Sequence, residues 1–211
     1  MKNEIYNYLD YYIPNVKCEL DFTKDYELLI ATVLSAQCTD KRVNIVTKKL
    51  WTKYDIYSLA NASTKDVEKI IKSCGSYTKK ADYIIKIAKS LTAKYDGKVP
   101  NDRKYLESLP GVGRKTCNDV LKNIYNEPCI PVDTHVSRVT KRLGLAAIND
   151  NPEKIEMKLM KKIPKKKWNR VSEQILLFGR YRCKSINPMC EKCLFQSICK
   201  YYKKECKNEL R

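Results

Sequence analysis

Apolar residues recur along most of the chain at the spacing of a helix face rather than at alternate positions. The clearest case is residues 79–95, which Asp96-Gly97 follow as a stop signal. Its apolar face consists of Ala81, Ile84, Ala88 and Leu91. Further helices are expected over residues 26–35, 40–54, 152–163 and 168–182. Neither a convincing period-two strand nor an Asn-Gly hairpin signal is present, so the expected class is all-α.

Polar residues mark where several of these helices begin or end. Asp40 is a candidate N-cap for a helix whose face carries Val43, Val46, Leu50 and Tyr54. Ser63 and Asp66 have the spacing of a capping box, and Gly75 is expected to stop the helix that they begin. Asp133 follows Pro131 and is a further candidate N-cap.

The charge balance points to a polyanionic partner. The chain of 211 residues has 42 Lys and Arg against 24 Asp and Glu, a formal net charge of +18, and a pI near 9.4. An excess of this size favours nucleic acid. The longest apolar runs, such as residues 28–34, are far too short to cross a bilayer, and residues 1–4 lack an apolar signal core. We therefore expect a cytoplasmic protein that does not associate with membranes.

Four of the ten cysteines follow the pattern C-x6-C-x2-C-x5-C within 17 positions: Cys183, Cys190, Cys193 and Cys199. Four clustered thiolates can close on one metal centre. Structural zinc usually takes two tight cysteine pairs, and only one is present, so the spacing favours an iron–sulfur cluster over zinc. The other cysteines, at positions 18, 38, 74, 117, 129 and 206, are expected to be reduced and mostly buried.

The segment Leu109-Pro-Gly-Val-Gly-Arg-Lys-Thr116 joins two helical stretches. Its two glycines permit a tight turn and a close approach to a partner, and the helix that starts near Gly113 offers an anion site to a DNA phosphate. Lys115 lies beside Arg114 and the positive end of the helix dipole, which disfavours its charged form and makes it a candidate nucleophile. A phosphate-binding lysine is the alternative interpretation. His135, the single histidine, is more simply explained by a structural hydrogen bond.

Four segments together resemble the endonuclease III family, in the order found in that family. LPGVGRKT at 109–116 resembles its helix-hairpin-helix motif, and VDTH at 132–135 resembles its catalytic aspartate segment. LSAQCTD at 34–40 resembles its LSAQ-x-TD segment, and the four clustered cysteines have its iron–sulfur spacing. These motifs span residues 34–199, so agreement of all four by chance is very improbable.

The resemblance implies two α-helical domains with a DNA-binding cleft between them. Residues 20–130 would form a six-helix barrel with the helix-hairpin-helix, and residues 1–19 with 131–211 would hold a structural [4Fe–4S] cluster. The implied activity is that of a bifunctional DNA glycosylase and abasic-site lyase, which removes oxidised pyrimidines and cuts the strand by β-elimination. Lys115 would form the Schiff base and Asp133 would stabilise the cationic sugar, while DNA would contact Gln37, Gly111, Gly113, Arg114, Thr116 and His135.

The expected partner is double-stranded DNA with damaged pyrimidines or abasic sites, bound by a monomer in a bacterial cytoplasm, at the nucleoid. One position departs from the family: Ser76 stands where Leu often helps to wedge the DNA. The alternatives are an adenine- or thymine-mismatch glycosylase of the same superfamily, or a non-enzymatic iron–sulfur DNA-binding protein. Mismatch glycosylases usually lack a lysine at the position of Lys115, and Lys115 together with Asp133 argues against a protein that only binds.

Overall fold

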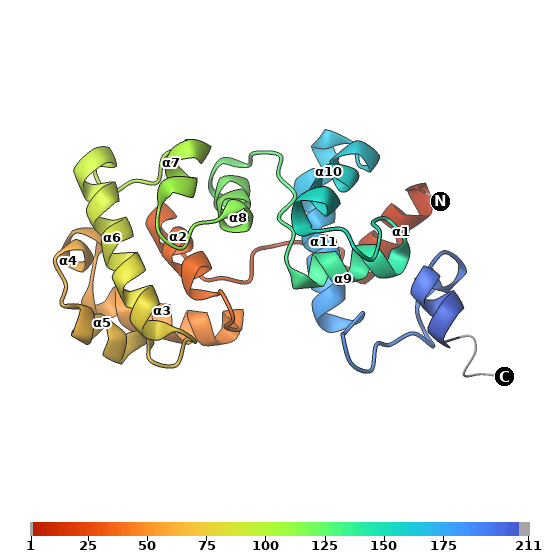
Figure 1. The fold of residues 1–211 in the computed structure, drawn as a ribbon, viewed down its shortest axis with the longest axis horizontal. Coiled ribbons are helices and arrows are strands. Elements are labelled where there is room, and N and C mark those ends of the chain that lie inside the picture. The colour runs from red at the N-terminus through yellow and green to blue at the C-terminus, as the bar shows by residue number, and fades with distance from the viewer. Residues whose placement is uncertain (1, 207–211) are drawn as a thin grey trace. The chain divides into compact units, whose positions relative to one another are not determined.

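In the computed structural model, which describes residues 2–206, every regular element is a helix (Figure 1). The expectation of an all-α protein is therefore confirmed for this part of the chain. The helices separate into two compact units. One is the continuous segment Cys18–Asn126, and the other combines Met1–Lys17 with Glu127–Arg211. Within residues 2–206, no helix has both the length and the apolar character needed to cross a membrane.

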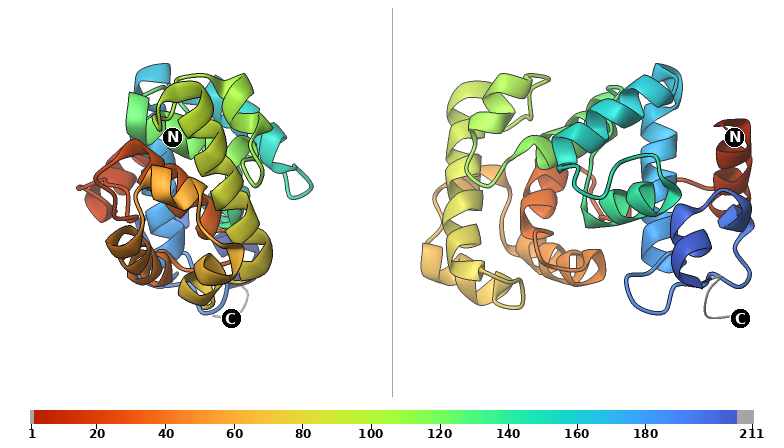
Figure 2. Two further views of the ribbon diagram at one scale, coloured as in Figure 1. Left: turned by 90° about the vertical axis from the view of Figure 1, so that its left-hand side faces the viewer. Right: turned by 45° about the vertical axis from the view of Figure 1, so that its right-hand side comes forward.

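The unit Cys18–Asn126, all of which is described, is built around a buried helix. Its seven helices are α2 (Asp25–Leu34), α3 (Asp40–Lys53), α4 (Ile56–Ala60), α5 (Thr64–Ile71), α6 (Tyr77–Tyr95), α7 (Arg103–Ser108) and α8 (Arg114–Tyr125). Helix α2 is mostly apolar, which suits its position: it packs against α3, α6 and α8 and is buried from Tyr26 to Leu34. Helix α6, the longest, also lies along α4 and α5 (Figures 1 and 2).

Helix positions follow the predictions more closely than helix ends do. The expected face of α6 is buried, and the helix ends before Asp96-Gly97 as predicted. The structure adds that Asp96 is left-handed, with φ +50. The N-cap of α3 is Thr39 rather than Asp40, because the Thr39 hydroxyl accepts the Arg42 N–H. The predicted capping box is wrong: Ser63 makes no side-chain cap, and Asp66 pairs with Lys69 at 3.0 Å instead. Helix α5 also ends at Ile71, before Gly75.

The second unit is centred on α11. Its described elements are α1 (Lys2–Tyr12), α9 (Thr134–Leu143), α10 (Pro152–Lys162), the 3-10 turns η1 (Lys165–Lys167) and η2 (Leu194–Ser197), α11 (Trp168–Tyr181), and the short π-helix η3 (Tyr202–Cys206). Helix α11 packs against α9 and α1, with Leu9, Val136 and Phe178 in the shared core. Gly179 allows a close approach of α11 to α9, because a Cβ there would lie 2.9 Å from Val139 Cγ2.

Candidate active site and cysteine cluster

The predicted hairpin is the turn between α7 and α8. Gly111 has φ +77, and a Cβ at that position would lie 2.8 Å from the ring of Tyr83, so glycine is required by conformation and by space. Buried Val112 anchors the turn. Gly113 is the N-cap of α8 and is exposed, with nothing within 4 Å of the place that a Cβ would occupy. The first turn of α8 therefore presents its N–H groups at an open surface, which suits a phosphate.

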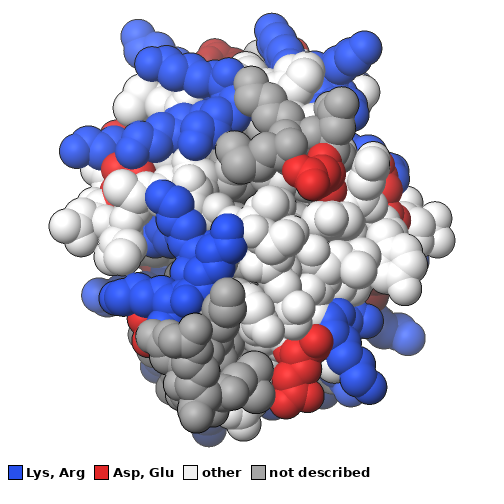
Figure 3. Space-filling model, turned by 90° about the vertical axis from the view of Figure 1, so that its right-hand side faces the viewer, with Lys and Arg blue, Asp and Glu red and all other residues white. Residues whose placement is uncertain are grey.

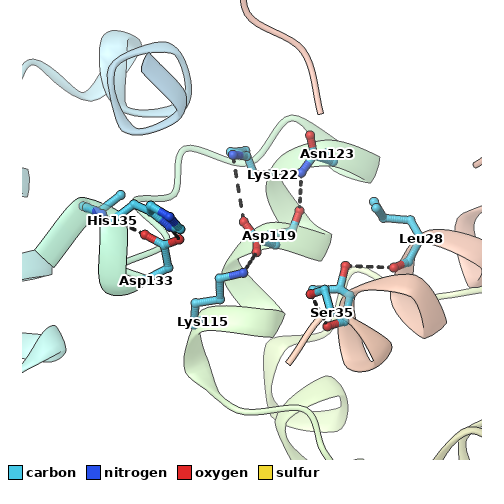
Figure 4. Close-up of polar contacts among 10 residues, drawn as sticks. Leu28, Ser35, Lys115, Asp119, Lys122, Asn123, Asp133 and His135 are labelled. Carbon is cyan, nitrogen blue, oxygen red and sulfur yellow. Dashed lines mark hydrogen bonds and ion pairs between the residues drawn. The ribbon is translucent and has the colours of Figure 1, made fainter. Parts of the chain in front are cut away.

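Lys115 lies in that first turn, and its nearest charge is negative. Its Nζ is 2.5 Å from Asp119 Oδ2, four residues along α8, as Figure 4 shows. Asp119 also lies 4.0 Å from the amine of buried Lys122. The prediction that only positive charge surrounds Lys115 is wrong, because i,i+4 spacing places the side chains of Lys115 and Asp119 together on the helix. The resting amine is therefore held in an ion pair on its own helix, with Asp119 as its partner.

Gln37 lies in the turn between α2 and α3 of the same unit, where its side chain is exposed. Its backbone is left-handed, with φ +55. Ser76, in the turn between α5 and α6, is also exposed and left-handed, with φ +56. Thus the segment that resembles the family's LSAQ motif and the segment with the unusual serine both present a side chain to solvent from a strained backbone.

Asp133 and His135 belong to the other unit, at the start of α9. The prediction that Asp133 is an N-cap is confirmed, since its Oδ1 accepts the Val136 N–H at 2.7 Å. Its Oδ2 lies 2.9 Å from His135 Nδ1, so this carboxylate also fixes the imidazole ring (Figure 4). Gly179 of α11 faces the base of this ring, because a Cβ there would lie 3.1 Å from His135 Cβ. The carboxylate is thus held by two donors at a tightly packed helix start.

The four clustered cysteines line one hollow. Its other walls are mostly apolar and include Phe178 and Phe195. Arg142 of α9 directs Nη1 to Cys183 Sγ at 3.4 Å, and the Tyr202 N–H points to Cys199 Sγ at 3.5 Å. Burial raises the pKa of the Cys193 and Cys199 thiols. Among the described residues, no three His, Cys, Asp or Glu side chains are arranged to hold a single metal ion.

This arrangement fits an iron–sulfur cluster. A four-iron cluster takes one thiolate on each iron, so its ligands surround a space instead of meeting at one ion, and hydrogen bonds to ligand sulfurs are typical of such sites. The remaining cysteines with described side chains form no disulfides, and Cys74, Cys117 and Cys129 are buried as expected. Cys18 and Cys38 are partly exposed, and the side chain of Cys206 lies outside the described residues.

Basic side chains cover much of one face of the molecule (Figure 3). On the face drawn in Figure 3, Lys and Arg cover more area than Asp and Glu, which form a few small patches. This distribution agrees with the formal net charge of +18. A polyanion can therefore be attracted over an area much larger than the turn at Gly113.

Comparisons with known proteins agree on one family. The family described as HhH-GPD superfamily base excision DNA repair protein matches residues 30–165. Endonuclease III of Bacillus subtilis is 42% identical over 198 residues, which are 93% of this chain and 90% of the relative. Endonuclease III of Escherichia coli K12 is 40% identical over 192 residues, 90% of either chain.

Two solved structures of endonuclease III with DNA have the same fold. A trapped covalent endonuclease III–DNA intermediate matches with a TM-score of 0.92 and 42% identity, covering 100% of this chain and 99% of that chain. A non-covalent endonuclease III–DNA complex matches with a TM-score of 0.94 and 42% identity, covering 98% of this chain and 99% of that chain. A thermostable thymine-DNA glycosylase, at 24% identity and a TM-score of 0.81, shares the fold.

Proposed function

The chain belongs to the endonuclease III family of base-excision DNA repair, whose members are DNA glycosylases and abasic-site lyases, and we propose that it removes oxidised pyrimidines through Lys115 and Asp133. One observation carries the assignment of the nucleophile. Lys115 follows directly after the glycine turn, in the first turn of α8, where a bound phosphate would place the sugar–phosphate chain beside its amine. DNA is the partner, and the enzyme acts on it as a monomer.

Lys115 performs the covalent step. Its neutral amine attacks C1′ of the damaged nucleotide, the bond from C1′ to the base breaks, and the base leaves with the bonding electrons and takes up a proton. Loss of the amine proton and opening of the sugar then give an imine. Removal of a C2′ proton moves electrons toward this imine, and the C3′–O bond breaks, which cuts the strand 3′ to the lesion. Asp119, 2.5 Å from the resting amine, holds Lys115 in place before attack.

Asp133 stabilises the positive charge that develops on the sugar and assists the proton transfers. Its second oxygen is already hydrogen-bonded to His135, so the carboxylate is oriented before DNA binds. His135 contacts the DNA backbone from the same helix start. On the hairpin, Gly111, Gly113, Arg114 and Thr116 grip phosphate through backbone N–H groups and side chains.

Gln37 enters the space that the damaged nucleotide leaves when it is flipped out of the stack. The nucleotide must leave because its sugar carbon is unreachable inside the duplex. With Ser76 in place of an apolar wedge, the filling of that space depends more strongly on Gln37.

Each compact unit has its own part in this scheme. Cys18–Asn126 serves as the helical barrel with the hairpin, and Met1–Lys17 with Glu127–Arg211 serves as the iron–sulfur domain. Cys183, Cys190, Cys193 and Cys199 hold a [4Fe–4S] cluster, supported by their shared hollow and by the donors aimed at two of the sulfurs. When bound, the cluster supplies a structural cross-link for this loop, and the reaction uses Lys115 and Asp133.

The activity is tested with three duplexes, which carry thymine glycol, 8-oxoguanine opposite adenine, or a ready-made abasic site. We expect release of thymine glycol, cutting of both the thymine glycol and abasic strands, and covalent trapping by borohydride, because borohydride reduces the imine to a stable amine. Release of adenine opposite 8-oxoguanine without trapping would instead identify an adenine-mismatch glycosylase. Binding to all three without base release or cutting would identify a non-enzymatic DNA-binding protein.

The cluster is tested by metal analysis of anaerobically prepared protein. We expect about four irons per chain and broad visible absorption. Cys190→Ser should lose iron and colour and also melt at a lower temperature, because folding of the ligand loop is coupled to cluster binding. Cys18→Ser, at a cysteine outside the four-cysteine spacing, is the control. It should keep its iron, its colour and its melting temperature. Stoichiometric zinc in place of iron would contradict the proposal.

A further inference from the structure

Two turns of the barrel unit have a backbone conformation that their residues do not favour. The described non-glycine residues with positive φ are Gln37, Ser76, Asp96, Asn126 and Asn187. Asn and Asp adopt this region readily, whereas Gln and Ser adopt it only where the surrounding structure holds them there. The surroundings of Gln37 and Ser76 must therefore supply that constraint.

The two strained turns lie close together. A Cβ on Gly75, the residue before Ser76, would lie 3.5 Å from the backbone oxygen of Gln37. Both side chains are exposed, so each turn presents its residue to solvent. The two strained residues therefore belong to one small region of the unit.

Lys80 of α6 is the side chain that joins this pair of turns to the end of α2. The Lys80 residue is only 5% exposed. Because lysine is rarely buried unless it has polar partners, such partners are expected here. Its Nζ donates to the carbonyl oxygens of Leu34 at 2.9 Å and Ala36 at 2.6 Å. The second carbonyl belongs to the peptide bond between Ala36 and Gln37, so the amine is hydrogen-bonded to the backbone directly before the strained residue.

The location of this amine suits a positive charge. The carbonyls at the end of α2 have no partners within the helix, and the helix dipole places negative potential there. Burial lowers the pKa of Lys80 from its usual value, and the nearby Cys74 and Cys38 thiols oppose that shift. Burying the amine costs free energy, and its two hydrogen bonds to the turn offset that cost. A buried cation with such bonds is expected to fix the local conformation of the chain that it contacts.

We propose that Lys80 is a positioning residue for base removal, which acts through Gln37 by holding the Leu34–Gln37 turn in its left-handed form. This inference rests on the proposed role of Gln37 as the residue that fills the vacated space in DNA. A turn held before DNA arrives presents Gln37 in the conformation required for insertion. Without the amine, the turn relaxes and the strain at Gln37 is released.

The first test compares two substrates. Lys80→Met keeps the length of the side chain but removes the donor, and it should slow release of thymine glycol about 100-fold, the effect of a displacement near 1 Å. Cutting at a ready-made abasic site should fall by only about 3-fold, because no base remains to be extruded. Lys80→Arg, which keeps a charged donor, should recover most of the lost base release. The control is Lys86→Met, on exposed α6 surface, which should match wild type on both substrates.

The second test is a double-mutant comparison, which a merely structural role for Lys80 would fail. If Lys80 acts through Gln37, then Gln37→Ala with Lys80→Met should release base no more slowly than Gln37→Ala alone. Multiplied losses in the double variant, or equal losses on both substrates in Lys80→Met, would overturn the inference. Should Lys80→Met not fold, Lys80→Gln gives the same comparison, because its shorter amide cannot reach both carbonyls. Wild-type protein without base release or trapping would overturn the proposed function instead, which separates the two failures.

Discussion

Lys115→Gln is expected to lose borohydride trapping entirely and to cut abasic DNA slower than wild type by at least about four powers of ten. Glutamine keeps similar length and polarity but has no nucleophilic nitrogen, so neither the imine nor its reduced product can form. Binding to lesion DNA should persist, because the glycine turn and the start of α8 remain. The measurements are single-turnover cutting, trapping on a denaturing gel, and a binding titration.

The fold should tolerate this change. The Lys115 side chain is 38% exposed, and the pair that it forms with Asp119 contributes below about 1 kcal/mol to stability. Asp119 keeps Lys122 as a neighbour at 4.0 Å. Lys69→Gln is the matched control, since it removes another Lys–Asp pair from an exposed helix surface, at 3.0 Å, far from the glycine turn in sequence. Trapping by Lys115→Gln at the wild-type level would show that a different amine is the nucleophile.

Local patterns in the sequence predicted the helices and their buried faces well. The face of α6 could be predicted because four apolar residues at helical spacing outweigh every local alternative, and Asp96-Gly97 can adopt the left-handed stop. Asp133 could be predicted as an N-cap because a proline-containing break precedes it. Cap chemistry was less predictable at α3 and α5. Adjacent Thr39 and Asp40 are both residue types that cap helices, and Asp66 pairs with Lys69 instead of completing a capping box.

The candidate site can be predicted from the sequence where its parts are close along the chain, and it cannot be predicted where they are distant. The glycine turn, Lys115 and the cysteine spacing are all local patterns. In the sequence, nothing distinguishes Lys80 from the other lysines. Its hydrogen-bond partners, Leu34 and Ala36, lie 46 and 44 positions away, and helical periodicity gives no information on contacts at that separation. The left-handed conformation of Gln37 lies beside those contacts and beside the neighbouring turn at Gly75, so it also appears only in three dimensions.

Asp133→Asn should slow base release by about two to four powers of ten, while slow trapping at a ready-made abasic site survives. The proposed nucleophile is intact, but the charge that we propose stabilises the cationic sugar is gone. Structure and chemistry can be separated here because asparagine is as good an N-cap as aspartate. Its Oδ1 can still accept the Val136 N–H that Asp133 accepts at 2.7 Å, so α9 should keep its start. Single-turnover base release and thermal unfolding, measured on the same preparation, provide both quantities.

Asp102→Asn makes the same substitution at another N-cap. The Asp102 side chain accepts the Tyr105 N–H at 3.0 Å at the start of α7, and it has no role in the proposed chemistry. We expect this variant to match wild type in base release and to unfold at nearly the same temperature. If Asp133→Asn and Asp102→Asn both released base at the wild-type rate, Asp133 would be a helix cap alone. If the loss of activity in Asp133→Asn were fully explained by a lower melting temperature, it would result from destabilisation of α9. The charge of Asp133 would then have no part in catalysis.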